Sequence, residues 1–432
     1  MSTASSEQAQ YHAIALQTEA CLNEHILDPW IPTALDPEDG GFKQFFSHNW
    51  VVERSKVRSV VYQSRLTWVS ARAARRYPGL YEKFTDFSSH GIDCLSQMMW
   101  DHTYGGFYWS IEDDLTPAPW KHVYGISFAI YALAGNFAAT QNESVLQLAI
   151  AAFHWLDQFA HDAENKGYYE ALQLDGAIIL SAEQVPSAEA FGLKPGHDAI
   201  GTLYGLKSMN THIHLLESFS ELYEVWPDSR LRERLIEVFE IVTTKVVHSE
   251  GYLHLYFQPD WTSVLTEDSY GHDIETAYLI VEAASVLGVL DDKIWALARK
   301  IVDHTLDVGW DVDNGGLYHE GHAHRGPTDA GQMEKGWWEQ AESLNALLLM
   351  HERFGSESPR YWEAFVSQWN FIHTHQIDRE FGGWFHAVSR EGVAPVLARK
   401  SDAWTDPYHQ SRALMNVTDA LIRLASTGHS PS

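Results

Sequence analysis

Apolar residues recur at spacings of three and four along most of the chain, which is typical of helices that bury one face. Within residues 207–226, for example, Leu215, Phe219 and Leu222 fall on the same side of a helix. Read in this way, the sequence predicts twelve helices and an all-α fold. The predicted helices span residues 7–27, 56–77, 80–99, 121–140, 142–161, 207–226, 228–247, 270–288, 290–307, 334–354, 358–376 and 406–426.

Six glycine–aromatic elements recur between the predicted helices. Their last glycines lie 61–84 residues apart, which is too long for common solenoid repeats but suits a pair of helices with a turn. The widest interval predicts an insertion within 171–206, and each element is expected to lead into a short strand-like stretch. The elements are Gly40-Gly41-Phe42, Gly105-Gly106-Phe107-Tyr108, Gly167-Tyr168-Tyr169, Gly251-Tyr252, Gly315-Gly316-Leu317-Tyr318 and Gly382-Gly383-Trp384-Phe385.

The connections between the predicted helices alternate in length. Short turns such as Pro78-Gly79 follow the even-numbered helices, whereas long loops follow the odd-numbered ones. Six helical hairpins with their long loops on one side predict a closed ring, an (α/α)6 barrel. We expect it to form a single domain over residues 1–432, with short β-hairpin-containing loops on one face. The competing arrangement is an open α-solenoid that binds proteins, but the varied, aromatic-rich loops favour closure.

Two of the even-numbered helices, which begin at one mouth of such a ring, carry a histidine in their first turn. Ser269 is a plausible N-cap, which places His272 in the first turn and Glu275 close to the same face. A second cap at Asp406 gives His409 the same position relative to its helix start. The helix macrodipole favours the neutral, proton-accepting form of an imidazole there. One such histidine usually only caps its helix or contacts solvent, but two that face one cavity indicate paired bases.

Other polar and aromatic side chains belong to the same predicted mouth. Arg65 lies in an otherwise apolar inner helix, where a charge is costly without a partner or ligand. A structural salt bridge explains Arg65 equally well when it is taken alone. Asn210 and His214 are four residues apart and therefore share a helix face. Further candidates at the helix starts are Tyr124, Trp338, Glu342 and Trp404.

The composition narrows the classes of function. Hydrophobic residues make up 45% of the chain and charged residues 20%, enough for a large packed core. The formal net charge of −28 repels nucleic acid and anionic membranes, and no apolar run is long enough to span a bilayer. We therefore expect a cytoplasmic protein with neither partner. Cys21 and Cys94 provide no disulfide framework and no cysteine-based metal spacing.

Four of the predicted helix starts together form a recognisable set of motifs: Lys207-Ser208-Met209-Asn210-Thr211-His212-Ile213-His214, Ser269-Tyr270-Gly271-His272-Asp273-Ile274-Glu275, Trp337-Trp338-Glu339-Gln340-Ala341-Glu342 and Trp404-Thr405-Asp406-Pro407-Tyr408-His409. This set resembles the N-acylglucosamine 2-epimerase superfamily, and within it the cellobiose 2-epimerases, over nearly the whole chain. The resemblance implies an (α/α)6 barrel. It also implies epimerisation at C2 of a reducing-end glucose or mannose unit, without a redox cofactor or metal.

The resemblance further implies roles for individual residues. His272 and His409 correspond to the catalytic pair. The implied substrate contacts are Arg65, Asn210, His214, Glu275, Trp338 and Trp404. We add Tyr124 and Glu342 to the substrate-binding group. The expected substrate is a small neutral mono- or disaccharide with a free reducing end, and the expected assembly is a monomer or homodimer.

The chemistry of C2 inversion suits this set of residues. After ring opening, the C2 proton leaves, a cis-enediolate forms, and a proton returns from the opposite face, so two groups that titrate near neutrality are needed. Arg65 would stabilise the negative charge that develops on O1 and O2. Glu275 would hold the tautomer of His272 or stabilise its imidazolium. We therefore count Arg65 and Glu275 among the catalytic residues.

Alternatives stay open on the sequence alone. A D-mannose 2-epimerase or a D-mannose/D-fructose isomerase of the same superfamily would use the same residues. The Tyr62-Gln63-Ser64 run before Arg65, where smaller residues are expected, leaves these mannose-acting branches open. An inverting glycoside hydrolase would need two separated carboxylates, for which Glu275, Glu342 and Asp273 are available.

Two further alternatives do not involve this chemistry. A metal could bind at His272-x-x-Glu275, or at His319, His322 and His324 in the loop after Gly316. For that loop, a solvated turn or a sugar-contacting loop is the favoured explanation. The chain could also be a non-catalytic toroid that binds carbohydrate.

Overall fold

The computed structural model describes residues 3–185, 191–264 and 267–427, and within them the chain is mostly helical with few short strands. Each of the twelve predicted helices corresponds to an observed one, so the prediction of a helical chain is confirmed. The helices are α1 (Thr3–Cys21), α3 (Val60–Arg76), α4 (Tyr81–Asp93), α5 (Val123–Thr140), α6 (Glu143–Phe159), α7 (Met209–Val225), α8 (Ser229–Ile241), α9 (Tyr270–Leu287), α10 (Asp292–Val308), α11 (Trp337–Phe354), α12 (Arg360–Phe371) and α13 (Tyr408–Thr427), with a short α2 (Asp28–Trp30) after α1.

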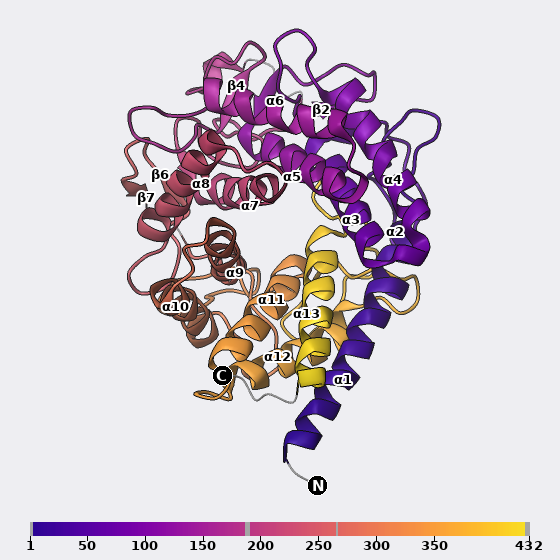
Figure 1. Ribbon diagram of the computed structural model, residues 1–432, viewed down its shortest axis with the longest axis vertical. Helices are drawn as coiled ribbons and strands as arrows, with labels where there is room; N and C mark the ends of the chain where they lie inside the picture. Colours follow the sequence, from indigo (N-terminus) through magenta and orange to yellow (C-terminus); the bar gives the residue numbers. More distant parts are fainter. Residues whose placement is uncertain (1–2, 186–190, 265–266, 428–432) are drawn as a thin grey trace.

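The even-numbered helices of the sequence prediction form an inner layer. Helices α3, α5, α7, α9, α11 and α13 pack on one another in this order, and α13 packs on α3 again. Helices α4, α6, α8, α10, α12 and α1 lie outside them, each against its inner partner (Figure 1). The inner helices contact neighbours on several sides, and α5 is accordingly buried over almost its whole length. By length and composition α5 could cross a membrane, but 83% of that span is buried among the other helices, as in the core helix of a globular protein.

Short antiparallel strands join neighbouring loops at one end of the inner helices. The strand before an inner helix usually pairs with a strand from the following loop, so the pairing links successive repeats instead of forming hairpins within one loop. A local hairpin between β6 and β7 is the exception among the described strands. The pairs are β1 (Arg58–Ser59) with β2 (Ser110–Ile111), β3 (Trp120–His122) with β4 (Ala171–Gln173), β5 (Lys207–Ser208) with β6 (Tyr256–Phe257) and β7 (Ser263–Val264), and β8 (Lys335–Gly336) with β9 (Ala387–Val388).

Buried ion pairs hold the glycine–aromatic turns. In one of them Asp101 accepts the backbone N–H groups of Thr103 and Tyr104, and Lys121 Nζ donates to its other oxygen at 2.8 Å. Gly106 at the end of this turn has φ +74°, which favours glycine. The cation comes from the segment that leads into the next inner helix, so each pair fixes a helix start against the preceding turn. The same arrangement occurs in Arg58–Asp36, Lys207–Asp162, Lys335–Asp311 and Lys400–Asp378.

Replacing Lys207 by alanine removes the positive partner of Asp162 and leaves that carboxylate buried and unpaired. We expect the free energy of unfolding to fall by about 3–5 kcal/mol, measured by urea denaturation followed by tryptophan fluorescence. As a control, Lys245→Ala removes an exposed lysine and should change this free energy by less than about 0.5 kcal/mol. An unfolding midpoint of Lys207→Ala equal to that of the wild type would mean that the pair does not stabilise the turn.

Candidate active site

A cavity of about 240 Å³ lies where the inner helices begin. It brings together nine of the ten residues that the sequence placed at the site, and Glu342 lies directly behind it in contact with His409. Ile200, from the long loop between β4 and β5, and Trp337 also contribute to the wall. The lining residues are Arg65, Tyr124, Ile200, Asn210, His214, His272, Glu275, Trp337, Trp338, Trp404 and His409.

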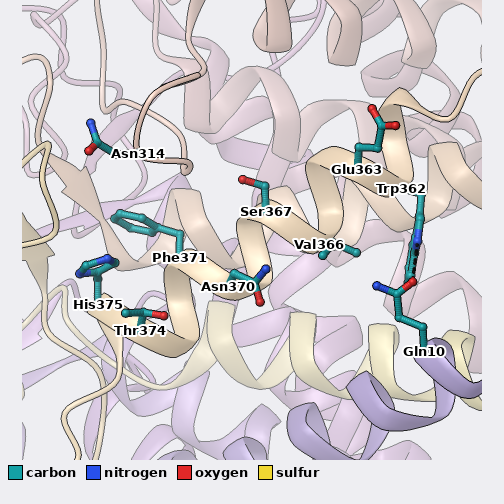
Figure 2. A pocket seen from close by; sticks show the side chains of 10 residues that line it. All are labelled: Gln10, Asn314, Trp362, Glu363, Val366, Ser367, Asn370, Phe371, Thr374 and His375. Carbon is teal, nitrogen blue, oxygen red and sulfur yellow. Dashed lines mark hydrogen bonds between the residues drawn. The ribbon is translucent and has the colours of Figure 1, made fainter.

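A larger hollow of about 520 Å³ lies along the outer helix α12 and has a different character (Figure 2). Its side chains come mainly from α12, with Gln10 from α1 hydrogen-bonded to the indole of Trp362. Its ionisable residues, Glu363 and His375, lie at opposite ends of the row (Figure 2). This hollow therefore offers no pair of groups for proton transfer, and the cavity at the inner helix starts is the candidate active site.

His272 is positioned by its own helix start. Ser269 is the N-cap residue of α9, but its hydroxyl bonds to His272 Nδ1 at 2.7 Å instead of to a backbone N–H. The imidazole packs on the indole of Trp338, with ring centroids 4.7 Å apart. Burial, together with the nearby His214, His319 and His409, lowers the pKa of His272 to about 3. The ring is therefore neutral near pH 7 and has a nitrogen available to accept a proton.

His409 has a carboxylate behind it. Its Nδ1 lies 2.8 Å from Glu342 Oε1 and 3.8 Å from Glu275 Oε1, and its ring centroid is 5.8 Å from that of Trp338. When Glu342 is ionised, Nδ1–H donates to it and Nε2 carries the lone pair. Burial, followed by the charges of Arg65 and Arg412, lowers the pKa of His409 well below its usual value. His409 is thus also neutral near pH 7, and Glu342 lies where it can stabilise the protonated form of this histidine.

Three buried carboxylates meet at the guanidinium of Arg412. Its Nη2 donates to Glu275 at 2.6 Å and lies 2.7 Å from Glu342, while Nη1 bonds to Glu217 and to the hydroxyl of Tyr408. Burial would raise the pKa of Glu217, but Arg412 and His214 lower it to about 2. Burial and the neighbouring Glu342 raise the pKa of Glu275 to about 8, and burial also raises that of Glu342. The cluster therefore retains a proton near neutral pH.

Arg65, on the first inner helix α3, bonds to the segment before α13 and to α5. Nη1 donates to Asp406 at 3.0 Å and Nη2 donates to the Tyr124 hydroxyl at 3.1 Å, while the guanidinium lies over the ring of Phe128. Asp406 also accepts the backbone N–H of Tyr408, so it both caps α13 and pairs with Arg65. Arg65 is thus in a buried salt bridge and also lines the cavity, so the two explanations suggested by its sequence do not exclude one another.

The remaining predicted residues supply polar and aromatic surface. His214 Nδ1 lies 3.0 Å from Glu217 Oε2, and Asn210 Oδ1 is buried without a hydrogen-bond partner among the described residues. Trp404 is 39% exposed at the rim, with its ring 6.2 Å from that of Tyr124. Trp338 packs against both catalytic candidates. An unpaired amide oxygen and an exposed indole in one cavity suit a ligand with hydroxyl groups and apolar faces.

Two metal sites were considered from the sequence as alternatives, and in the first, His272-x-x-Glu275, the carboxylate accepts from Arg412. Glu275, Glu342 and His409 offer ligand atoms within 4.8 Å of one another, but Arg412 already donates to both carboxylates. The guanidinium supplies the positive charge that a metal ion would bring. In the loop after Gly316, His319 Nδ1 bonds to Glu339 at 2.5 Å, while His322 and His324 line a separate hollow. The three loop histidines therefore do not converge.

Glu217 and Arg412 are the site residues that sequence reasoning missed. Each lies three residues after a predicted histidine, Glu217 after His214 and Arg412 after His409, and so shares its helix face. That spacing was the available signal. Of the neighbouring Trp337 and Trp338, only Trp338 was a predicted site residue. The ring of Trp337 packs on that of His386, with centroids 4.4 Å apart, and Trp337 also lines the cavity.

Comparison with known proteins places this geometry in context. Residues 40–151 and 194–413 match the family model described as N-acylglucosamine 2-epimerase (GlcNAc 2-epimerase). The cellobiose 2-epimerase of Bacteroides fragilis is 29% identical over 90% of this chain and 95% of its own. A D-mannose isomerase of Marinomonas mediterranea is 24% identical over 94% and 98%. The solved structure of cellobiose 2-epimerase from Spirochaeta thermophila has a TM-score of 0.83 at 28% identity, over 96% of this chain and 98% of that one.

Replacing Glu275 by glutamine should flatten the pH dependence of stability. Because the folded state raises the pKa of Glu275 from 4.5 to about 8, its stabilising contribution is complete below pH 4.5 and is lost as the pH rises towards 8. In that window the free energy of unfolding should fall by up to about 1.4 kcal/mol per pH unit in the wild type. Urea denaturation at several pH values should show a smaller fall in Glu275→Gln, in which the amide still accepts from Arg412.

The control is Glu240→Gln, which changes an exposed carboxylate and should follow the wild-type curve. Equal slopes in Glu275→Gln and the wild type would mean that Glu275 is ionised across this range.

Proposed function

The chain belongs to the N-acylglucosamine 2-epimerase family and is a carbohydrate epimerase, an isomerase; we propose that it interconverts reducing-end D-glucose and D-mannose units. The reaction is of the type that converts cellobiose to 4-O-β-D-glucosyl-D-mannose. The observation that carries this proposal is that two neutral imidazoles, His272 and His409, line one cavity and both contact the indole of Trp338. The cyclic packing of the inner helices supports assigning the chain to the (α/α)6-barrel class, as one catalytic domain over residues 1–432.

Epimerisation begins with the open-chain aldose. One imidazole removes the C2 proton, and the electron pair of the broken C–H bond forms the C1–C2 double bond of a cis-enediolate while O1 takes the negative charge. The other imidazole then delivers a proton to C2 from the opposite face as the carbonyl re-forms. One proton leaves and one arrives, so the reaction needs no oxidant, reductant or cofactor. Each general acid–base step contributes about 10²–10⁴-fold to the rate.

The neighbouring charges fit the charges that develop in this reaction. Arg65 is a fixed cation at the cavity wall and stabilises O1 and O2 of the enediolate. Glu342 accepts from His409 Nδ1 and favours the imidazolium that forms when His409 takes a proton. Glu275, which was expected to support His272, lies instead beside His409 and Arg412 and acts on that histidine. Ser269 takes the corresponding position at His272.

The binding residues indicate a neutral sugar. Asn210 and His214 bind hydroxyl groups, and Tyr124 orients Arg65 through its hydroxyl. Trp338 supplies the apolar surface beneath the reacting end, and Trp404 at the rim suits a second sugar ring beyond it. The three carboxylates around Arg412 leave an excess of negative charge, which disfavours anionic sugars.

The alternative function within the same chemistry is aldose–ketose isomerisation of D-mannose. The D-mannose isomerase relative, which aligns over nearly the whole chain, supports it. In that reaction the proton taken from C2 returns to C1, and a single histidine can carry it. An inverting hydrolase is less well supported, because Glu275 and Glu342 offer oxygens within 4.8 Å, whereas inversion needs a carboxylate separation of about 6.5–9.5 Å. The third carboxylate, Asp273, bonds to the backbone of Leu253 and lies outside the cavity lining.

Product analysis in deuterated water tests the proposed function. Cellobiose, glucose, mannose and N-acetylglucosamine are incubated separately with the enzyme and analysed by NMR and mass spectrometry. We expect a C2 epimer of cellobiose that carries one deuterium at C2, because the second base exchanges its proton with solvent. A ketose product would establish the isomerase instead, and free glucose would establish a hydrolase.

Single-histidine variants test the two-base mechanism. We expect His272→Ala and His409→Ala each to lose epimerisation by at least about 10²–10⁴-fold with an unchanged circular dichroism spectrum. Each variant should still exchange the C2 hydrogen of one epimer with solvent, because the remaining base faces only one side of C2. The exposed His102→Ala is the matched control and should turn over like the wild type. Wild-type turnover in either active-site variant would remove the two-base mechanism.

A further inference from the structure

The fourth repeat departs from the ion-pair arrangement that holds the other glycine–aromatic turns. In four repeats the residue directly before the N-cap of the inner helix is a buried cation: Arg58, Lys121, Lys207 and Lys335. In the fourth repeat this position is Asp268, which is 2% exposed. In those four repeats the cation pairs with an aspartate of the preceding glycine–aromatic turn. The corresponding turn residue of the fourth repeat is His248. The positive charge that the other repeats supply from a lysine or arginine is therefore absent from the described partners of Asp268.

A second substitution in the same repeat adds another carboxylate. At the fourth helical position after the cap, Gln63 and Gln340 each accept the N–H and donate to the C=O of the residue that follows the glycine turn. The fourth repeat has Asp273 at this position. Its Oδ1 accepts the N–H of Leu253 at 3.0 Å, but a carboxylate cannot donate in return. Its Oδ2 is left buried without a hydrogen-bond partner among the described residues.

The two carboxylates meet one histidine. His304 Nε2, from α10, lies 3.1 Å from Asp268 Oδ2 and 3.9 Å from Asp273 Oδ2. Asp268 Oδ1 is also buried without a hydrogen-bond partner. The ligand atoms of these three residues all lie within 4.8 Å of one another. Burial and the charge of Asp268 raise the pKa of Asp273 well above its usual value, so two adjacent carboxylates are costly here without a compensating cation.

We propose that Asp268, Asp273 and His304 bind a divalent transition-metal ion, of which zinc is the best fit, in place of the lysine or arginine of the other repeats. Carboxylate oxygen and imidazole nitrogen are usual zinc ligands, with bonds of about 2.0–2.2 Å. A tetrahedral ion with such bonds holds neighbouring ligand atoms about 3.3 Å apart, close to the separations from His304 Nε2. A hollow of about 430 Å³ adjoins Asp268 and gives the ion an entry path and room for a water ligand.

The ion would act on the helix that carries His272. Asp268 precedes the cap Ser269, Asp273 follows His272 directly, and His304 belongs to the outer helix α10. One ion thus ties the loop, the first turn of α9 and α10 together. This role is structural: it goes beyond the proposed epimerase reaction and adds no step to it.

A similar cluster elsewhere lacks the exchange of charges that carries this proposal. His122, Glu170 and Asp198 also offer ligand atoms within 4.8 Å. There, however, Glu170 accepts from the Ser208 N–H and the Thr211 hydroxyl, so both of its oxygens are used. The Tyr124 N–H donates to His122 Nδ1, which leaves the ring proton on Nε2, facing Asp198 at 3.1 Å. His122 Nε2 and Asp198 Oδ2 lack a hydrogen-bond partner among the described residues, but this repeat keeps its buried cation, Lys121, paired with Asp101. The lost cation that carries the proposal is therefore not a feature of this cluster.

Metal titration of the whole protein tests the proposal. The chain, free of any polyhistidine tag, is stripped with EDTA, dialysed and titrated with zinc chloride by isothermal calorimetry, and its thermal unfolding is followed with and without zinc. We expect one zinc per chain and a higher melting temperature. Asp273→Asn, which keeps the acceptor for Leu253, should weaken zinc binding by about tenfold or more and lose the shift in melting temperature. His304→Gln is a second variant with the same expected result.

His324→Gln is the matched control. It removes an exposed imidazole from the adjoining hollow without touching the three ligands, and its zinc affinity should stay within about threefold of the wild type. Failure of the stripped wild type to bind zinc would overturn the proposal and mean that the two carboxylates share a proton. Loss of binding in His324→Gln but not in Asp273→Asn would overturn it in favour of surface histidines. Neither result would bear on epimerisation, which is measured separately.

Discussion

The guanidinium of Arg412 is the contact on which the rest of the site depends. It bonds to Glu217 of α7, Glu275 of α9 and Glu342 of α11 from its own place on α13, so one side chain joins four of the inner helices. The carboxylates are almost wholly buried, and none of them could remain ionised there without a cation. A buried pair that loses one partner is strongly destabilised, since the other charge is left without compensation. The helix starts that carry His214, Glu275 and His409 therefore hold their relative positions because Arg412 does.

The same cluster sets the proton balance of the site. Burial lowers the pKa of both His272 and His409, so each imidazole is neutral at pH 7, while it raises the pKa of Glu275 and Glu342. When His409 takes a proton, the carboxylate 2.8 Å from its Nδ1 compensates the new charge within the cavity. His272 has a neutral hydroxyl at the corresponding place. The two imidazoles thus have unequal surroundings, and an imidazolium is better stabilised at His409. This difference is compatible with reversibility in the proposed mechanism, because each direction of the reaction would use each histidine once.

The helices and most of the candidate site residues could be predicted from the sequence because both follow from the spacing of residues that are close together in the chain. The helices have long apolar stripes and clear punctuation, and the candidate histidines sit at fixed distances from Ser269 and Asp406, which are local features. Arg412 and Glu217 have the same three-residue spacing from His409 and His214, but a charged residue on a helix is normally solvated. Only the packing of the inner helices puts them in one buried cluster. The lysine–aspartate pairs were missed for a related reason, since Asp162 and Lys207 lie far apart in sequence and meet only when a turn packs on the next helix start. Glu275 shows the limit of helix-face reasoning: it shares a face with His272, yet its charge is directed to His409 of another helix.

The repeated ion pairs also show which inner helices depart from the regular arrangement. Four inner helices, α3, α5, α7 and α11, follow directly after a buried cation that is tied to the preceding turn. The two that do not are α9, which has Asp268 at that position, and α13, whose cation Lys400 precedes the helix by several residues. These are the helices that carry His272 and His409. The segment between Lys400 and α13 contains Asp406, which pairs with Arg65, and Trp404, which lies at the rim. This segment therefore both joins the last inner helix to the first and forms part of the cavity wall. At the start of α9, Asp268 and Asp273 lie on either side of Ser269 and His272 in the sequence and both face His304. The regular repeats hold the starts of α3, α5, α7 and α11, and these helices also supply side chains to the cavity. The helices that carry His272 and His409 begin where the regular arrangement is broken.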